Sequence, residues 1–454
     1  MQDLEHVAEK QFRAECSRIT LVREGAKPLH LEGPGSLSQD ATGRLCFELR
    51  PDAKSHRALL DDYNRGAAVG QIIPESDYFE ITAHESGGFA PWCGKVAYVD
   101  MRTGLMSGGV VFGSPDGLSR EHFPATTPPE REGVTLYLEG PISFPIHDKT
   151  ITDVQRGGKT VLSRQHWDHT RFQIDHEEFS LVDCGSYTLL ECLLEPGGIG
   201  RYRHVRMLEA LQFALGQTMH PSAIFLNSAA GRRATIRSFA RAEQKGAGVR
   251  PPLAFSMGPG PSAVFGIVEA YYRRVLEWTD ADWHTVTRRG YQLIQAGGSP
   301  VEIMALAYSV ATEGAIGDCF SALAQSSPEF AAEIDRLIGL MPGLNASPAT
   351  TQRLVGSLRA MKHTRNSDRL RAFIAQCGLP PAVLEAWTRT RNSAAHGVDT
   401  PRFDAQARLN DLLRILHLFY SIVLTFVRYS GPRTDYLTSG HPEQHWPSEN
   451  SPGT

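Results

Sequence analysis

Residues 404–429, DAQARLNDLLRILHLFYSIVLTFVRY, form the stretch of this 454-residue chain that decides its fold. Apolar side chains recur along it every three or four positions, which is the spacing of one helical face. Ile415, Leu418 and Ile422 add a second apolar face, and a helix that is apolar nearly all round is buried on several sides. The pattern predicts a helix, capped by Asp404, at the centre of a bundle or against a partner subunit.

Helical spacing also dominates the residues that precede this stretch, from Ser262 onward, where strand signals almost disappear. We therefore predict an all-α helical bundle over residues 262–431 and a flexible tail over residues 432–454, which are polar and lack periodicity. The predicted helices cover about 262–279, 283–295, 299–325, 328–340, 349–361, 367–376, 381–396 and 404–429.

Residues 1–245 have a different pattern, with short apolar runs separated by Gly, Pro and Asp, as in a β-sandwich or barrel. One amphipathic helix is predicted within this part, at about 201–215. The Gly- and Pro-rich segment 246–261, GAGVRPPLAFSMGPGP, is predicted to be a linker. The expected fold class is thus α+β and multidomain, with a β-rich sensor or regulatory domain followed by a helical bundle.

The composition is that of an ordinary globular protein, 41% hydrophobic and 21% charged. The formal net charge of −4 excludes a uniformly basic nucleic-acid-binding coat. Seven cysteines without a C-x-x-C pair argue against a disulfide framework or a Cys-based zinc site. The N-terminus is charged where a signal peptide is apolar, and the most apolar segment, 415–427, is too short to span a bilayer. We expect a cytoplasmic protein.

A basic stretch lies between residues 353 and 391 of this otherwise acidic chain. It contains eight Lys/Arg and two Asp/Glu, a net charge of +6. This arrangement favours binding of a polyanion, and the alternative that the sequence leaves open is a solvated helix face. The basic residues are Arg353, Arg359, Lys362, Arg365, Arg369, Arg371, Arg389 and Arg391.

The end of this stretch, WTRTRNSAAHG at 387–397, holds the candidate catalytic residues Arg391, Asn392 and His396. Metal-free RNA cleavage by the substrate's 2′-hydroxyl needs an acid/base group that titrates near neutral pH, which histidine supplies. It also needs a cation on the phosphate, and the planar fork of arginine suits phosphate oxygens. Asn392 and His396 share a helical face, whereas Arg391 lies about 140° from His396 and must use its length. The alternative is that Arg391 and His396 only cap and solvate a helix end.

The motif R-N-x-x-x-H-G, followed after a short gap by a long apolar helix, resembles the Apea-like HEPN domain of the HEPN superfamily. The β-rich part before it looks like the N-terminal domain that accompanies such domains. The resemblance covers nearly the whole chain and is specific at 387–431.

The resemblance implies a metal-independent endoribonuclease that leaves a 2′,3′-cyclic phosphate and needs no metal or cofactor. It implies Arg391 and His396 as catalytic residues, Asn392 as a supporting residue, and a homodimer that brings two motifs into one cleft. It also implies a toxin-like effector of prokaryotic anti-phage defence (abortive infection), with a phage-derived trigger sensed by the N-terminal domain. Glu313, on an earlier helix, is a candidate for an additional acidic residue, although a place on the helix surface is the simpler interpretation.

Two other functions stay open from the residues alone. The helical bundle could be a non-catalytic module that dimerises or binds nucleic acid or a partner protein. Alternatively, His166, His169 and His176 could hold a metal in a hydrolase of the N-terminal part, although no Cys or carboxylate completes a convincing ligand set.

A group of basic residues on the predicted helix at 201–215 could contact RNA or another domain, or form a solvated face. These residues are Arg201, Arg203, His204 and Arg206.

Overall fold

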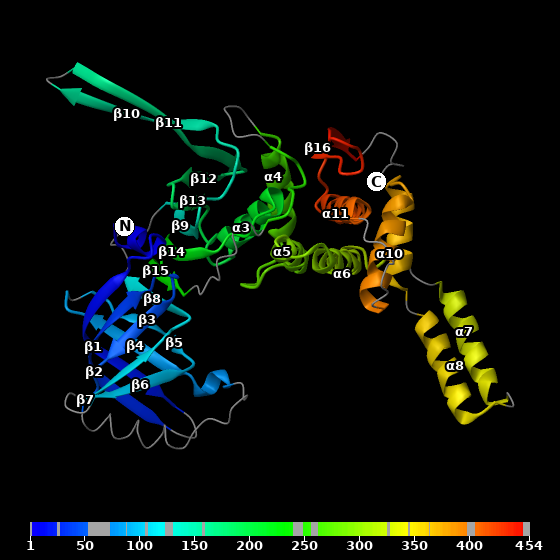
Figure 1. Ribbon diagram of the computed structural model, residues 1–454, viewed down its shortest axis with the longest axis horizontal. Coiled ribbons are helices and arrows are strands. Elements are labelled where there is room, and N and C mark those ends of the chain that lie inside the picture. Colours follow the sequence, from blue (N-terminus) through cyan, green and yellow to red (C-terminus); the bar gives the residue numbers. More distant parts are fainter. Residues whose placement is uncertain are drawn as a thin grey trace. The chain divides into compact units, whose positions relative to one another are not determined.

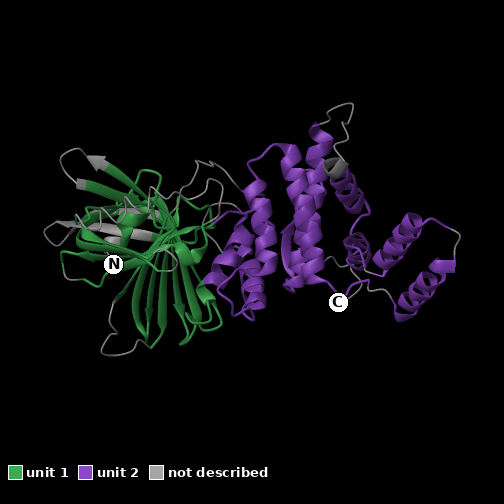
Figure 2. Ribbon diagram, turned by 90° about the horizontal axis from the view of Figure 1, so that it is seen from below, with its two compact units in different colours: residues 1–204, 219–244, 257–261 green, residues 205–218, 245–256, 262–454 purple. Residues whose placement is uncertain are grey.

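The computed structural model describes residues 2–24, 28–52, 73–87, 89–104, 108–122, 130–156, 159–238, 248–255, 262–324, 327–343, 346–362, 364–396 and 405–447. The chain forms two compact units (Figure 2). One comprises residues 1–204, 219–244 and 257–261, and the other comprises residues 205–218, 245–256 and 262–454. The first is β-rich and the second is helical, which confirms the predicted order of a β-rich part followed by a helical part.

Within its described residues, the β-rich unit has fifteen strands in one antiparallel sheet, ordered β10-β11-β12-β13-β9-β14-β15-β8-β5-β4-β1-β2-β3-β7-β6 (Figure 1). The helix α1 (Gln2–Ala8) packs near β9 and β14, and a 3-10 turn covers Glu75–Asp77. The strands are β1 (Arg13–Arg23), β2 (Leu29–Gln39), β3 (Leu45–Leu49), β4 (Phe79–Glu85), β5 (Trp92–Val96), β6 (Val99–Gly104), β7 (Gly108–Gly113), β8 (Gly117–His122), β9 (Glu132–Glu139), β10 (Asp148–Arg156), β11 (Lys159–Ile174), β12 (Glu177–Asp183), β13 (Tyr187–Leu194), β14 (Pro221–Ser228) and β15 (Gly231–Arg237).

Alternation of buried and exposed side chains explains why these segments form strands. On β1, Leu21 pairs with Leu31 of β2 and with Ile81 of β4, and all three side chains are at most 1% exposed. The register of β1 shifts between Cys16 and Ile19, both of which are buried. A bulge at this point returns the apolar positions to the core face after two successive exposed residues.

The helical unit contains the helices that the spacing predicts. Their ends lie within about four residues of the predicted ones, except that the helix predicted at 299–325 ends at Cys319. Two of them begin with a serine cap followed by proline: the side chain of Ser327 accepts a hydrogen bond from the Phe330 amide, and that of Ser347 from the Thr350 amide. The helices are α3 (Arg203–Leu215), α4 (Val264–Val275), α5 (Thr285–Ala296), α6 (Val301–Cys319), α7 (Pro328–Leu340), α8 (Pro348–Met361), α9 (Asn366–Gln376), α10 (Ala382–His396) and α11 (Ala405–Phe426), with a 3-10 turn at Met341–Gly343.

The long apolar helix α11 forms the core of this unit, as predicted. It packs against α6 and α10, and α6 also contacts α5 and α9. Ile415, Leu418 and Ile422, the second apolar face, are fully buried. Of the described residues, only α11 combines the length and hydropathy of a membrane span, and 61% of its most apolar window is buried inside the protein. This burial is compatible with the core helix of a soluble protein.

The helix α3 belongs mainly to the helical unit, which corrects its predicted place in the N-terminal domain. Arg206 is fully buried and donates hydrogen bonds to the carbonyl oxygens of Asp280 and Asp282, at 3.3 and 2.8 Å. Glu209 is also fully buried and accepts a hydrogen bond from the His284 amide at 2.8 Å. These contacts tie α3 to the segment before α5, so Arg206 does not lie on a solvated face.

The C-terminal residues correct the predicted flexible tail over residues 432–454. Strands β16 (Gly431–Thr434) and β17 (Glu443–Trp446) pair in an antiparallel hairpin. The guanidinium of Arg433 stacks 3.9 Å from the centre of the Trp446 ring, and both side chains are at most 3% exposed. Tyr436 donates a hydrogen bond to the Pro251 carbonyl, so part of the predicted linker over 246–261 is packed as well. Residues 448–454 lie outside the described residues.

Candidate active site

The helix α10 positions the candidate residues against α6. It starts after Pro380 and Pro381, as the sequence predicts. The indole nitrogen of Trp387, one turn before Arg391, donates a buried hydrogen bond to the Ser309 carbonyl of α6 at 3.0 Å. This bond fixes the rotation of α10 about its axis, because an indole N–H buried in a core needs an acceptor.

Arg391 and Glu313 form a bidentate ion pair between α10 and α6. The Nε atom of Arg391 lies 2.5 Å from Oε2 of Glu313, and the Nη2 atom of Arg391 lies 3.3 Å from Oε1. This hydrogen bonding raises the pKa of Arg391. The Arg391 side chain is 40% exposed and that of Glu313 is 26% exposed, so the guanidinium is held in place and still accessible to a ligand. Glu313, the additional acidic candidate, is therefore in contact with Arg391.

Arg389, two residues earlier on α10, points to a different helix. Its guanidinium makes two hydrogen bonds of 2.8 Å to the carboxylate of Asp411 on α11, which also accepts a bond from Arg414 at 3.0 Å. Asp411 is buried, so this ion pair joins α10 to α11. The two arginines at the end of α10 thus have separate partners, and only Arg391 faces the candidate acidic residue.

The other two candidates occupy the last turn and a half of α10. Asn392 is exposed. The helix continues to His396, so positions 392 and 396 lie on one face, one turn apart. The side chain of His396 lies outside the described residues, as do residues 397–404.

The histidine candidates of the β-rich unit form no ligand set in the part of the chain that the structure describes. His169, on β11, lies 2.8 Å from a carboxylate oxygen of its neighbour Asp168. No group of three His, Cys, Asp or Glu residues that could hold a metal occurs among the described side chains, and the side chain of His166 lies outside them. Glu177 is buried against Arg203, whereas Glu178 is exposed.

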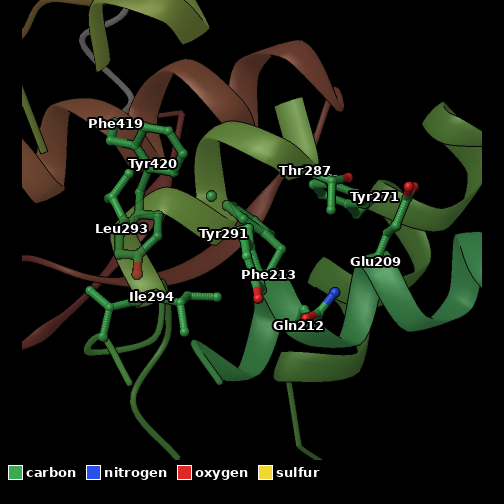
Figure 3. Close-up of a pocket in the computed structure, with 12 residues that line it drawn as sticks. Glu209, Gln212, Phe213, Tyr271, Thr287, Tyr291, Leu293, Ile294, Phe419 and Tyr420 are labelled. Atoms are coloured by element: carbon green, nitrogen blue, oxygen red, sulfur yellow. Dashed lines mark hydrogen bonds between the residues drawn. The ribbon is translucent and has the colours of Figure 1, made fainter. Parts of the chain in front are cut away.

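Arg206 and Glu209 of α3 form a buried ion pair that the sequence did not indicate. Glu209 lines a small cavity together with Gln212, Thr287 and aromatic side chains such as Phe213 (Figure 3). The cavity measures about 20 Å³, which is room for roughly one water molecule. Burial raises the pKa of Glu209 to about 7, and the nearby Arg206 acts in the opposite direction. A cavity that has room for about one water molecule indicates a structural role for Glu209.

Comparison with known proteins adds no relative. No protein-family model matches the chain, no curated protein matches it, and no solved structure matches it. The features that bear on function are therefore the geometry of α6, α10 and α11 and the motif on α10.

Proposed function

We propose that the protein is a metal-independent endoribonuclease of the HEPN type that leaves a 2′,3′-cyclic phosphate. The observation that carries the proposal is the pairing of Arg391 with Glu313 at an accessible junction of α10 and α6. The guanidinium of Arg391 is thereby held in position before the substrate binds, and the length of its side chain has to bring it to the phosphate from a helical position about 140° from His396. Incubation of the full chain with end-labelled RNA and a chelator tests the proposal.

Each residue has a specific role in this proposal. His396 removes the proton from the 2′-hydroxyl or protonates the leaving 5′-oxygen, because an imidazole titrates in the range that both steps need. Arg391 binds the scissile phosphate and stabilises the charge that develops on it. Asn392 is a supporting hydrogen-bonding residue on the same face as position 396. Glu313 is a positioning residue that holds the Arg391 guanidinium before the substrate binds.

An exposed apolar face on α6 supports a homodimer through the helices of this unit. Ile303, Leu306 and Val310 follow helical spacing and are 55%, 44% and 43% exposed. Leu409, at the start of α11, is 40% exposed, and the neighbouring Arg408 donates a hydrogen bond to Glu302 of α6 at 2.7 Å. We call these four apolar residues the α6 patch. Glu313 continues the same helical stripe, so a partner on the α6 patch would bring a second copy of the motif close to the first.

Replacing Leu306 with aspartate is expected to convert the dimer to a monomer and to lower RNA cleavage. A charge in the middle of an apolar interface is desolvated without a partner. Light scattering after size-exclusion chromatography measures the mass, and Leu354→Asp on α8, where Leu354 is 42% exposed, is the matched control. A Leu306→Asp protein that remains dimeric, or a parent that is monomeric, would contradict the proposed interface.

The biological role that we propose is a toxic effector of prokaryotic anti-phage defence, acting in the cytoplasm. The β-rich unit would then sense a phage-derived trigger or restrain the helical unit. The alternative is a non-catalytic module that uses the α6 patch to dimerise or to bind a partner. The two functions differ in the His396→Ala protein, because a binding module needs no acid/base group at position 396.

A further inference from the structure

A second arginine, Arg369, lies in the first turn of α9, a helix that contacts α6. The side-chain amide of Asn366 stands over Gly317 of α6, where an added Cβ atom would be 3.3 Å from Oδ1 of Asn366. Gly317 follows Glu313 by four residues, so both positions lie on one face of α6. Arg369 donates a hydrogen bond to Oδ1 of Asn366 at 2.7 Å. Arg369 is thus bonded to a residue that lies beside the face of α6 on which Glu313 holds Arg391.

The charge of Arg369 is not neutralised within the part of the chain that the structure describes. The neighbouring arginines have carboxylate partners: Arg289 pairs with Asp318, and Arg371 pairs with Asp368. No described carboxylate lies within 4.0 Å of Arg369, which is bonded to the neutral amide of Asn366. Its Nε atom is buried and has no hydrogen-bond partner among the described atoms.

A half-buried guanidinium that has no carboxylate partner among the described residues is expected to bind an anion. Arginine binds phosphate oxygens well because its donors are fixed in a plane. Asn366 already accepts from Arg369 through Oδ1, so its amide N–H groups remain as additional donors to the same anion.

We infer that Arg369 and Asn366 bind the RNA phosphate next to the one held by Arg391. The inference rests on the proposed function, since it assigns the first phosphate to Arg391. Glu313, which contacts Arg391, and Gly317, which lies beside Asn366, are one helical turn apart on α6. This spacing is comparable with that of neighbouring phosphates in an extended single strand. The subsite makes the enzyme prefer single-stranded RNA with a phosphate beyond the cleavage point over a dinucleotide.

The most specific test is Asn366→Asp, because an aspartate side chain has nearly the same shape as asparagine and would pair its carboxylate with Arg369. The new charge neutralises Arg369 and repels phosphate, so the fold keeps its stability while RNA binding weakens. We expect about a tenfold lower affinity for a fluorescent single-stranded oligoribonucleotide, measured by anisotropy in chelator on the His396→Ala background. Gln376→Glu, at the exposed far end of α9, controls for the change in net charge.

Arg369→Gln provides a second variant, because glutamine can keep the bond to Asn366 and removes only the charge. It should lower the slope of log affinity against log salt by about 0.7, the value for one phosphate of a single strand. Arg371→Ala, which removes an exposed and paired arginine of the same helix, should leave the slope unchanged. In cleaving protein, Arg369→Gln should raise KM and change kcat little.

The outcomes separate the subsite from the nuclease. If the parent binds and cuts RNA and neither Asn366→Asp nor Arg369→Gln differs from its control, the proposed phosphate subsite is contradicted and the proposed nuclease activity is supported. If the parent binds RNA through Arg369 without cutting it, the proposed nuclease activity is contradicted and the proposed phosphate subsite is supported. If the parent shows no affinity for single-stranded RNA, both are overturned.

Discussion

Replacing Arg391 with alanine is expected to lower the rate of RNA cleavage by about 10²–10³-fold. The guanidinium is the only cation that the proposal places on the scissile phosphate, and its pairing with Glu313 holds it in position before the substrate arrives. The pair is partly exposed, so its loss should cost no more than about 1 kcal/mol of stability. A thermal melt of each protein separates loss of activity from loss of fold.

Arg389→Ala is the matched control for this prediction. Arg389 lies on the same helix and makes the same two-pronged contact with a carboxylate, but the carboxylate is Asp411 of α11. We expect its replacement to change the cleavage rate by less than about threefold when the protein remains folded. Equal losses in the two variants, or full activity of Arg391→Ala, would contradict the assignment of Arg391 to the phosphate.

The second large effect concerns stability: Arg206→Met is expected to destabilise the protein by about 3–5 kcal/mol. Arg206 and Glu209 are both 0% exposed, and their charged atoms approach to 3.4 Å. Removing the arginine leaves the Glu209 carboxyl buried next to apolar and aromatic side chains and frees the Asp280 and Asp282 carbonyls. Urea denaturation followed by circular dichroism measures the loss.

The double variant Arg206→Met/Glu209→Leu separates the cost of an unpaired charge from that of lost packing. Replacing both members of a buried ion pair with apolar residues of similar volume is often neutral or stabilising. We therefore expect the double variant to recover most of the stability that Arg206→Met loses. A single variant that costs less than about 1 kcal/mol, or a double variant less stable than the single one, would contradict this account of α3.

The helices of the second unit could be predicted because their signals are local. Apolar spacing, serine caps before proline and the breaks between helices all lie within a few residues of each helix, and the predicted range 328–340 matches α7 at both ends. The C-terminal hairpin could not be predicted in this way. Its stability depends on contacts with distant residues, such as that of Tyr436 with Pro251.

The candidate site was only partly predictable for the same reason. The motif placed Arg391, Asn392 and His396 on one helix, but Arg391 and Glu313 are 78 residues apart in the chain. Only the packing of α10 on α6 brings Glu313 to Arg391. The burial of Arg206 could not be predicted either, because a basic residue on an amphipathic helix usually faces solvent. Its burial depends on two backbone carbonyls of a segment more than seventy residues away.

Full-length protein is the correct material for testing the nuclease, since a fragment that starts at residue 262 would lack α3 and its buried contacts with the segment before α5. The most direct measurement incubates full-length parent and His396→Ala proteins with end-labelled single-stranded RNA in excess chelator and identifies the product ends by mass spectrometry. We predict 2′,3′-cyclic phosphate ends from the parent and a rate about 10²–10⁴-fold lower from His396→Ala. RNA left intact by well-folded parent protein, or equal cleavage by the two proteins, would contradict the proposal.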